Sequence, residues 1–287
     1  KKAAGSVVAA TVQLFRQVAG EMRPTPKKSH YIFNLRDLSN VFAGILQAEP
    51  SYLISDGHVC RLWAHECLRV FSDRLVDEDD RTWLLAQMQD SILPTLFQLK
   101  WNQILTLAVP NRTTVKDAGG GSGENGNDAD VDGTKDAESL VSTADGEQGD
   151  AAPPPLLFGS FTNPSAFSDA DRKYEDLGGL GSNNLIALVQ SYLTEYNSSR
   201  ADGGMDLVLF MYCVEHVVRV SRVLSQRGGN ALLVGVGGSG RKSVTALSCF
   251  ISNQKLEQIE LTKSYGFIEW REDVKRCLEA SMCDYKF

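Results

Sequence analysis

The first hundred residues carry apolar side chains at helical spacing in four successive stretches. The first follows the i, i+4, i+7 pattern and is expected to end at Pro24 and Pro26, and the fourth is expected to end at Pro94. The apolar positions of the four stretches are, in order, Val8, Val12, Phe15 and Val18; Leu35, Leu38, Val41, Phe42 and Ile45; Leu68, Phe71 and Leu75; and Leu84, Leu85, Met88 and Ile92. Four helices with short connections predict a small helical domain, or lid, over residues 1–111.

The pattern changes in the second half of the chain. Residues 156–227 predict a helical linker, whose clearest helix is Asp206–Leu224 with Asp206 as N-cap and Gly228-Gly229 as stop. Residues 228–287 then predict buried strands alternating with helices. The expected order is a strand at 231–234, a glycine-rich turn, a helix at 241–251, a strand at 256–261 and a helix at 268–282. This order is typical of the start of an α/β nucleotide-binding domain.

The two halves are separated by an acidic segment at residues 112–155. Ten acids and two lysines between Thr114 and Ala151 give it a charge of −8, so the rest of the −7 chain is nearly neutral. It has almost no large apolar residue and is expected to be a disordered insertion in a surface loop. Asp128, Asp130, Asp132 and Asp136 match part of a calcium-binding loop, but Ser139 stands where the bidentate glutamate belongs. We interpret the match as a product of acidic low complexity.

Several classes of function find no support in the residues. The nearly neutral remainder shows no basic stripe for nucleic acid, and no run approaches the roughly 20 apolar residues that span a membrane. The six cysteines form no C-x-x-C and are interpreted as reduced, buried thiols. His65 and Glu66 are interpreted as packing and solvent positions rather than a metal pair. Without an initiator Met or signal peptide, the chain is expected to be a slice of a longer protein.

A glycine-rich turn carries the candidate chemistry. It follows the predicted strand directly, precedes a helix, and lets backbone N–H groups surround an anion. When the turn is aligned to the P-loop pattern G-x-x-x-x-G-K-[ST], Arg241 stands at the position of the lysine and Lys242 at the position of the Mg²⁺-binding hydroxyl residue. Ser243 then follows one residue after that hydroxyl position. The predicted nucleotide-binding residues are Gly235, Val236, Gly237, Gly238, Ser239, Gly240, Arg241, Lys242 and Ser243, and Ser243 is the candidate Mg²⁺ ligand. The arginine keeps the charge but is bulkier, and a lysine cannot ligate Mg²⁺.

Three stretches resemble one family. Residues 229–241 (Gly-Asn-Ala-Leu-Leu-Val-Gly-Val-Gly-Gly-Ser-Gly-Arg) resemble the P-loop of the fourth AAA+ module of dynein heavy chains, especially the axonemal ones. Residues 29–39 and 62–75 resemble the helical small subdomain of the third module, and 206–224 resemble the helix leading into the fourth. The resemblance covers nearly the whole chain outside the acidic insertion. It implies an α/β AAA+ fragment, in which a helical lid precedes the start of a P-loop domain.

The resemblance also implies a function. Such a chain belongs to a ring of six AAA+ modules that drives microtubule-based movement in cilia and flagella, with ATP or ADP and Mg²⁺ as cofactors. Its partners would be the other modules, the microtubule through parts outside this chain, and dynein intermediate and light chains. The implied localisation is the cytoplasm and the axonemal cytoskeleton. Arg36 falls where AAA+ lids place a sensor-II arginine, although it could also be an exposed charge at a helix start. Family members usually carry Gln at position 242, and Lys242 departs from that.

Two alternatives stay open beside a motor-ATPase segment. In one, the glycine turn is empty and the acidic insertion recruits a partner, so the chain is a non-enzymatic scaffold. The other is a generic P-loop GTPase or kinase, which the long helical region before the turn disfavours. Residues 228–287 contain no Walker B acid, sensor I or arginine finger. The chain alone is therefore not expected to hydrolyse ATP, although the intact motor would.

Overall fold

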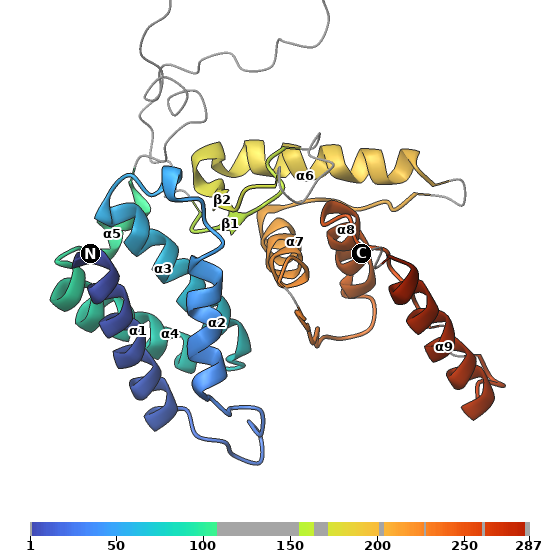
Figure 1. Cartoon of the computed structure of the whole chain (residues 1–287), viewed down its shortest axis with the longest axis horizontal. Helices are drawn as coiled ribbons and strands as arrows, with labels where there is room; N and C mark the ends of the chain where they lie inside the picture. Colours follow the sequence, from blue (N-terminus) through green and yellow to red (C-terminus); the bar gives the residue numbers. More distant parts are fainter. Residues whose placement is uncertain are drawn as a thin grey trace, which may run out of the picture. The chain divides into compact units, whose positions relative to one another are not determined.

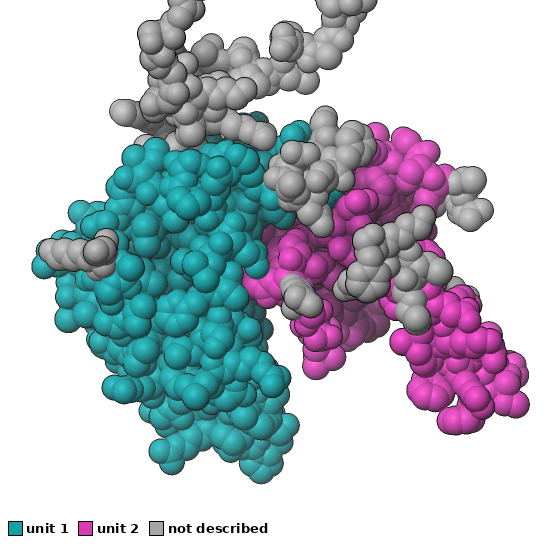
Figure 2. Space-filling model, in the orientation of Figure 1, with its two compact units in different colours: residues 1–188 teal, residues 189–287 magenta. Residues whose placement is uncertain are grey.

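The computed structural model describes residues 2–107, 155–163, 172–200, 204–226, 228–259 and 262–284. The acidic insertion up to Pro154, and with it the partial calcium-loop match, lies outside these residues. The chain divides into two compact units, Lys1–Leu188 and Val189–Phe287 (Figure 2). Helices dominate both units (Figure 1). Among the described residues no helix is long and apolar enough to cross a membrane.

The first unit is a helical bundle built on α1 and α3 (Figure 1). Helix α1 packs against α2, α3 and the π-helix η3, and α3 also packs against α2 and α5. The fold therefore matches the predicted helical lid. The elements of the bundle are α1 (Lys2–Glu21), α2 (Leu35–Ile45), η1 (Pro50–Tyr52), α3 (Asp56–Val70), η2 (Ser72–Arg74), α4 (Glu78–Ala86), η3 (Gln87–Phe97) and α5 (Trp101–Leu105).

The buried face of α1 differs from the predicted one. The core takes Val7, Ala10, Leu14 and Val18, whereas Val8 is 51% exposed. The apolar residues of this segment allow two helical stripes, one that includes Val8 and one that includes Val7. Packing against η3 and α3 buries the stripe that includes Val7. Trp63 reaches this face from α3, where its indole Nε1 donates to Thr11 Oγ1 at 3.0 Å. The Thr11 hydroxyl donates in turn to the Val7 carbonyl at 2.7 Å, so the buried polar atoms are satisfied.

Two predicted helix ends in the first unit are wrong. Pro94 lies inside η3, which runs on to Phe97 and ends where Gln98 adopts a left-handed φ of 58°. Proline lacks the N–H donor and its ring displaces the carbonyl four residues before it, so a regular α-helix is disfavoured here, and the chain continues in the wider π-type turn. The third predicted stripe also extends beyond its helix, because α3 already ends at Val70. Its last two members, Phe71 and Leu75, lie on either side of the short η2.

A short antiparallel pair of strands follows the insertion. Strand β1 (Phe158–Gly159) pairs with β2 (Glu175–Asp176), and η5 (Leu177–Leu180) leads into helix α6 (Gly181–Ser198). These strands could not be predicted from the sequence, because each has only two residues and no alternation of apolar and polar side chains can be recognised in so few. The boundary between the two compact units falls inside α6.

The second unit contains α7 (Met211–Leu224), α8 (Arg241–Ile251) and α9 (Phe267–Asp284). Helices α7 and α8 pack together, and the Ser248 hydroxyl donates to the Val217 carbonyl at 3.3 Å between them. Helix α7 begins five residues later than predicted, so Asp206 is not its N-cap. Residues 204–210 are extended instead, with alternate side chains partly buried. The predicted helix end at Leu224 is confirmed, but Ser225 is the C-cap and Gly228-Gly229 lies beyond it rather than ending the helix. Gly229 is nevertheless required at its position, because a Cβ there would lie 1.9 Å from the Val223 carbonyl oxygen.

The two predicted strands of this unit are not paired. Residues 231–236 and 254–259 are described and form no strand, and Leu232 and Val234 are 90% and 85% exposed rather than buried. A parallel strand gains its ladder and its burial only from neighbouring strands. Within the described part of the chain, β1 and β2 are the only paired strands. The order of glycine turn and helices is nevertheless that of a P-loop domain fragment.

Candidate functional site

The glycine turn has the backbone geometry that its sequence predicts. Gly238 and Gly240 adopt left-handed φ values of 79° and 75°, which residues with a Cβ rarely adopt. The turn tightens further where the Ser239 N–H donates to the Val236 carbonyl at 3.4 Å. Glycine at these two positions is therefore required by the backbone itself.

The turn leads directly into the N-terminus of α8. Gly240 is its N-cap and offers no side-chain hydrogen bond, and the first intrahelical bond joins the Val244 N–H to the Gly240 carbonyl at 2.9 Å. The N–H groups of Arg241, Lys242 and Ser243 thus have no acceptor within the helix. Together with the positive end of the helix dipole, they favour an anion here.

Arg241 lies back across the turn. Its guanidinium Nη2 donates to the Val236 carbonyl at 3.1 Å, and Nη1 is 3.5 Å from the Leu233 carbonyl. The Ser239 hydroxyl closes the same loop, since a Cβ at Gly235 would lie 2.9 Å from its oxygen. The arginine therefore holds a positive charge over the loop, where the P-loop lysine carries its own.

A cavity of about 310 Å³ opens beside the first turns of α8. Its volume is at the lower end of the range for ligand pockets. Arg200 and Lys242 bring two cations to its lining, which contains no carboxylate. The lining residues are Tyr196, Arg200, Met205, Lys242, Ser243, Ala246, Leu256 and Gln258.

The wall of the cavity opposite α8 is fixed by hydrogen bonds. The Asn197 side chain donates to the Met205 carbonyl at 3.0 Å and accepts from the Met205 N–H at 2.7 Å. A Cβ at Gly204 would lie 2.5 Å from Asn197 Cγ, so a side chain there would break the arrangement. The Tyr196 ring meets Phe250 of α8 edge-on at 5.4 Å, and the Arg200 guanidinium lies 4.8 Å from the Tyr196 ring centroid.

The predicted sensor residue Arg36 lies in the first turn of α2 and is exposed. The turn is fixed by a capping box, in which Asn34 Oδ1 accepts from the Arg36 N–H and Asp37 Oδ2 accepts from the Asn34 N–H, both at 2.8 Å. Asp37 does not face water, because Arg74 Nη1 donates to its other oxygen at 2.9 Å. The sensor assignment of Arg36 stays a prediction.

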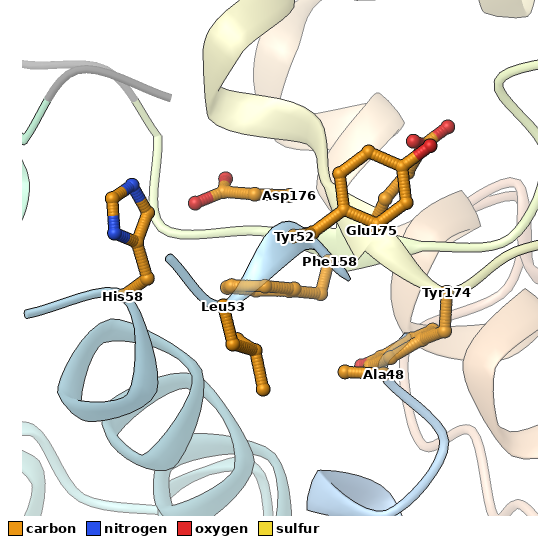
Figure 3. Close-up of a pocket in the computed structure, with 8 residues that line it drawn as sticks. All are labelled: Ala48, Tyr52, Leu53, His58, Phe158, Tyr174, Glu175 and Asp176. Carbon is orange, nitrogen blue, oxygen red and sulfur yellow. The ribbon is translucent and has the colours of Figure 1, made fainter. Parts of the chain in front are cut away.

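His65 and Glu66 belong to the core, and the prediction of a solvent position is wrong. Both side chains are 0% exposed. Glu66 Oε1 accepts from the Tyr174 hydroxyl at 2.6 Å, and His65 Nδ1 is 3.1 Å from the Leu156 carbonyl oxygen. Tyr174 also lines a small cavity of about 30 Å³, with His58 and Asp176 among the side chains around it (Figure 3). That volume holds one or two waters at most, so we assign the cavity to packing.

The comparisons with known proteins agree with the resemblance seen in the sequence. Residues 1–81 match the family model "Dynein heavy chain, ATPase lid domain", and residues 205–286 match "P-loop containing dynein motor region D4". The chain is 36% identical to dynein axonemal heavy chain 1 of Mus musculus over 276 residues, which is 95% of this chain and 5% of that protein. It is 37% identical to dynein axonemal heavy chain 12 of Rattus norvegicus over 269 residues, or 94% of this chain and 8% of that protein. The chain belongs to the axonemal dynein heavy chains.

The dynein family implies Mg²⁺ beside the nucleotide, and the residues of this site fit it poorly. Mg²⁺ takes oxygen ligands in near-octahedral geometry. Lys242 stands at the P-loop hydroxyl position, and its ammonium has three donors and no lone pair. Ser243 lines the cavity and stays the predicted ligand, but it lies about 100° further around α8. No carboxylate lines the cavity, and the described residues hold no cluster of three or more His, Cys, Asp or Glu that could bind a metal.

Sequence reasoning missed the cavity wall of this dynein segment. Arg200, Tyr196 and Met205 lie between 30 and 39 residues before Gly235 and belong to no motif. The apolar spacing over Asp206–Phe210 predicted a helix, so the extended segment that carries Met205 was not expected. The single usable signal was the sequence Asp202-Gly203-Gly204, which is typical of a turn.

Proposed function

We propose that this chain is the segment of an axonemal dynein motor in which a lid joins the next nucleotide site, and that residues 235–243 bind ATP or ADP. The supporting observation is the uncapped N-terminus of α8, which follows two left-handed glycines and borders a cavity with two cations and no carboxylate. The axonemal relatives indicate a place in the axoneme of a cilium or flagellum.

The remaining parts of this proposal concern the whole protein, because the chain spans only 5–8% of the relatives described above. The whole heavy chain would hydrolyse ATP and move along microtubules, with the other AAA+ modules and the intermediate and light chains as partners. Within the chain, α6 supports coupling between modules: one continuous helix contributes residues to both compact units. A change of nucleotide that moves Arg200 would therefore act on the end of a helix that begins in the first compact unit, Lys1–Leu188, which we call the lid unit.

The binding proposal is tested by counting nucleotides on a full-length heavy chain that carries these residues. Gly240→Asp places a carboxylate and a left-handed backbone strain at the anion site, and we expect the variant to retain one ADP fewer in Mg²⁺ buffer. Gly228→Asp is the matched control, because it has a similar φ of 69° outside the turn. Arg241→Ala should weaken binding by about tenfold or more, as expected for one lost charged hydrogen bond. Equal stoichiometry in Gly240→Asp and wild type would favour the scaffold alternative.

A further inference from the structure

Lys242 occupies a distinctive place in the candidate site. It is the second residue of α8, beside the helix N-terminus, and its exposed side chain lines the cavity of about 310 Å³. Its ammonium has no ion-pair or hydrogen-bond partner among the residues that the structure describes. The ammonium on its flexible stem is therefore available to a ligand in the cavity.

The charges around Lys242 suit a phosphate rather than a metal ion. Arg200 faces the same cavity, Arg241 lies over the adjoining loop, and no carboxylate lines the space. A divalent cation at this point would meet three positive side chains and the positive end of a helix. An ammonium is a compact point charge that binds phosphate oxygens well. It can offset the same negative charge that Mg²⁺ offsets in other P-loop sites.

We propose that Lys242 replaces Mg²⁺ at this site, so that the glycine turn binds ADP or ATP without a divalent cation. The inference rests on the proposed nucleotide-binding function. The α8 N–H groups and Arg241 hold the phosphates, and Lys242 supplies the remaining positive charge from the position where a hydroxyl would otherwise bind the metal. Such a site holds its nucleotide whatever the free Mg²⁺ concentration, which suits a regulatory position in a ring better than a hydrolytic one.

The test uses a full-length heavy chain, with ADP as the probe, and measures bound ADP per chain in excess Mg²⁺ and in excess EDTA. Other sites on the chain are removed from the count by subtracting the Gly240→Asp value in each buffer. Two variants address Lys242 directly. Lys242→Thr restores the hydroxyl of the P-loop pattern, and Lys242→Gln removes the charge without supplying a good metal ligand. Both replace an exposed side chain, and thermal unfolding checks that they fold.

For wild type we expect the difference to be one ADP in both buffers. Lys242→Thr should keep that ADP in Mg²⁺ and lose it in EDTA, and Lys242→Gln should bind ADP about tenfold more weakly in EDTA. Loss of the wild-type ADP in EDTA, with retention in Mg²⁺, would overturn the inference and leave the proposed function intact. No difference from Gly240→Asp in either buffer would overturn both.

Discussion

Arg61 and Asp176 form a buried ion pair between α3 and β2, with Arg61 Nε 2.5 Å from Asp176 Oδ2. The arginine side chain is 0% exposed and that of the aspartate 9%. The same guanidinium donates from Nη1 to the Ile104 carbonyl at 2.9 Å and from Nη2 to the Pro155 carbonyl at 2.8 Å. One side chain therefore joins four parts of the lid unit, including both segments that flank the acidic insertion.

Removing one partner of this pair should destabilise the lid unit strongly. Arg61→Met leaves the Asp176 carboxylate without its charged partner. It also leaves three carbonyl groups, those of Ile104, Leu105 and Pro155, without their arginine donor. We expect a loss of about 3–5 kcal/mol in unfolding free energy. Urea denaturation measures this loss. Arg36→Met is the control, since Arg36 is exposed on the same unit, and it should change stability by about 0.5 kcal/mol or less. A similar small effect of both variants would contradict the assignment of Arg61 as the structural anchor.

The insertion itself should be dispensable for folding. Because Arg61 contacts the carbonyls of Ile104 and Pro155 at once, the chain leaves and re-enters the unit at nearly the same place. Replacing residues 112–152 by a short Gly/Ser linker should leave stability equal, or raise it by about 1 kcal/mol through a lower loop-closure cost. A longer deletion that also removes Pro155 and the buried Leu157 should be destabilising. If the shorter deletion unfolds the unit, the insertion contributes to the fold after all.

The buried thiol of Cys60 gives the lid unit a dependence on alkaline pH. Burial raises the pKa of Cys60 from 9.0 to about 12. Below pH 9 the thiol is protonated in both folded and unfolded states, so its contribution is fully present. Between about pH 9 and 12 only the unfolded chain loses the proton, and stability should fall by about 1.4 kcal/mol per pH unit. Cys60→Ala should show a shallower decline over this range in urea denaturation, and an unchanged slope would contradict the prediction.

Local features of the chain were predictable where neighbouring residues alone determine them. The glycine turn and the start of α8 at Arg241 depend on backbone freedom within a few residues, and both are confirmed. Features set by distant partners were not. The shift of the α1 stripe from Val8 to Val7 depends on the surface it meets, and the sequence of α1 supports both stripes.

The same distinction explains the candidate site. The glycine turn and the start of α8, which form the proposed phosphate-binding half, follow from one motif and could be predicted residue by residue. The other half depends on Arg200 and Tyr196 at the end of α6, which reach the cavity only through tertiary packing. The predicted strand at 231–234 failed for a related reason, since a parallel strand needs neighbours that periodicity in its own sequence cannot supply.

Asn197 should act on nucleotide affinity through the cavity wall rather than by touching the ligand. Its side chain donates to the Met205 carbonyl and accepts from the Met205 N–H, and so places Met205 and Arg200 around the cavity. Asn197→Ala should weaken ADP binding by about tenfold, because two hydrogen bonds that order the wall are lost. Asn197→Asp keeps one acceptor for the Met205 N–H and should give an intermediate affinity. Titration of ADP into full-length heavy chain variants measures this order, with exposed Gln190→Ala on the same helix as control. Equal affinities for Asn197→Ala and Gln190→Ala would show that the wall does not contribute to the site.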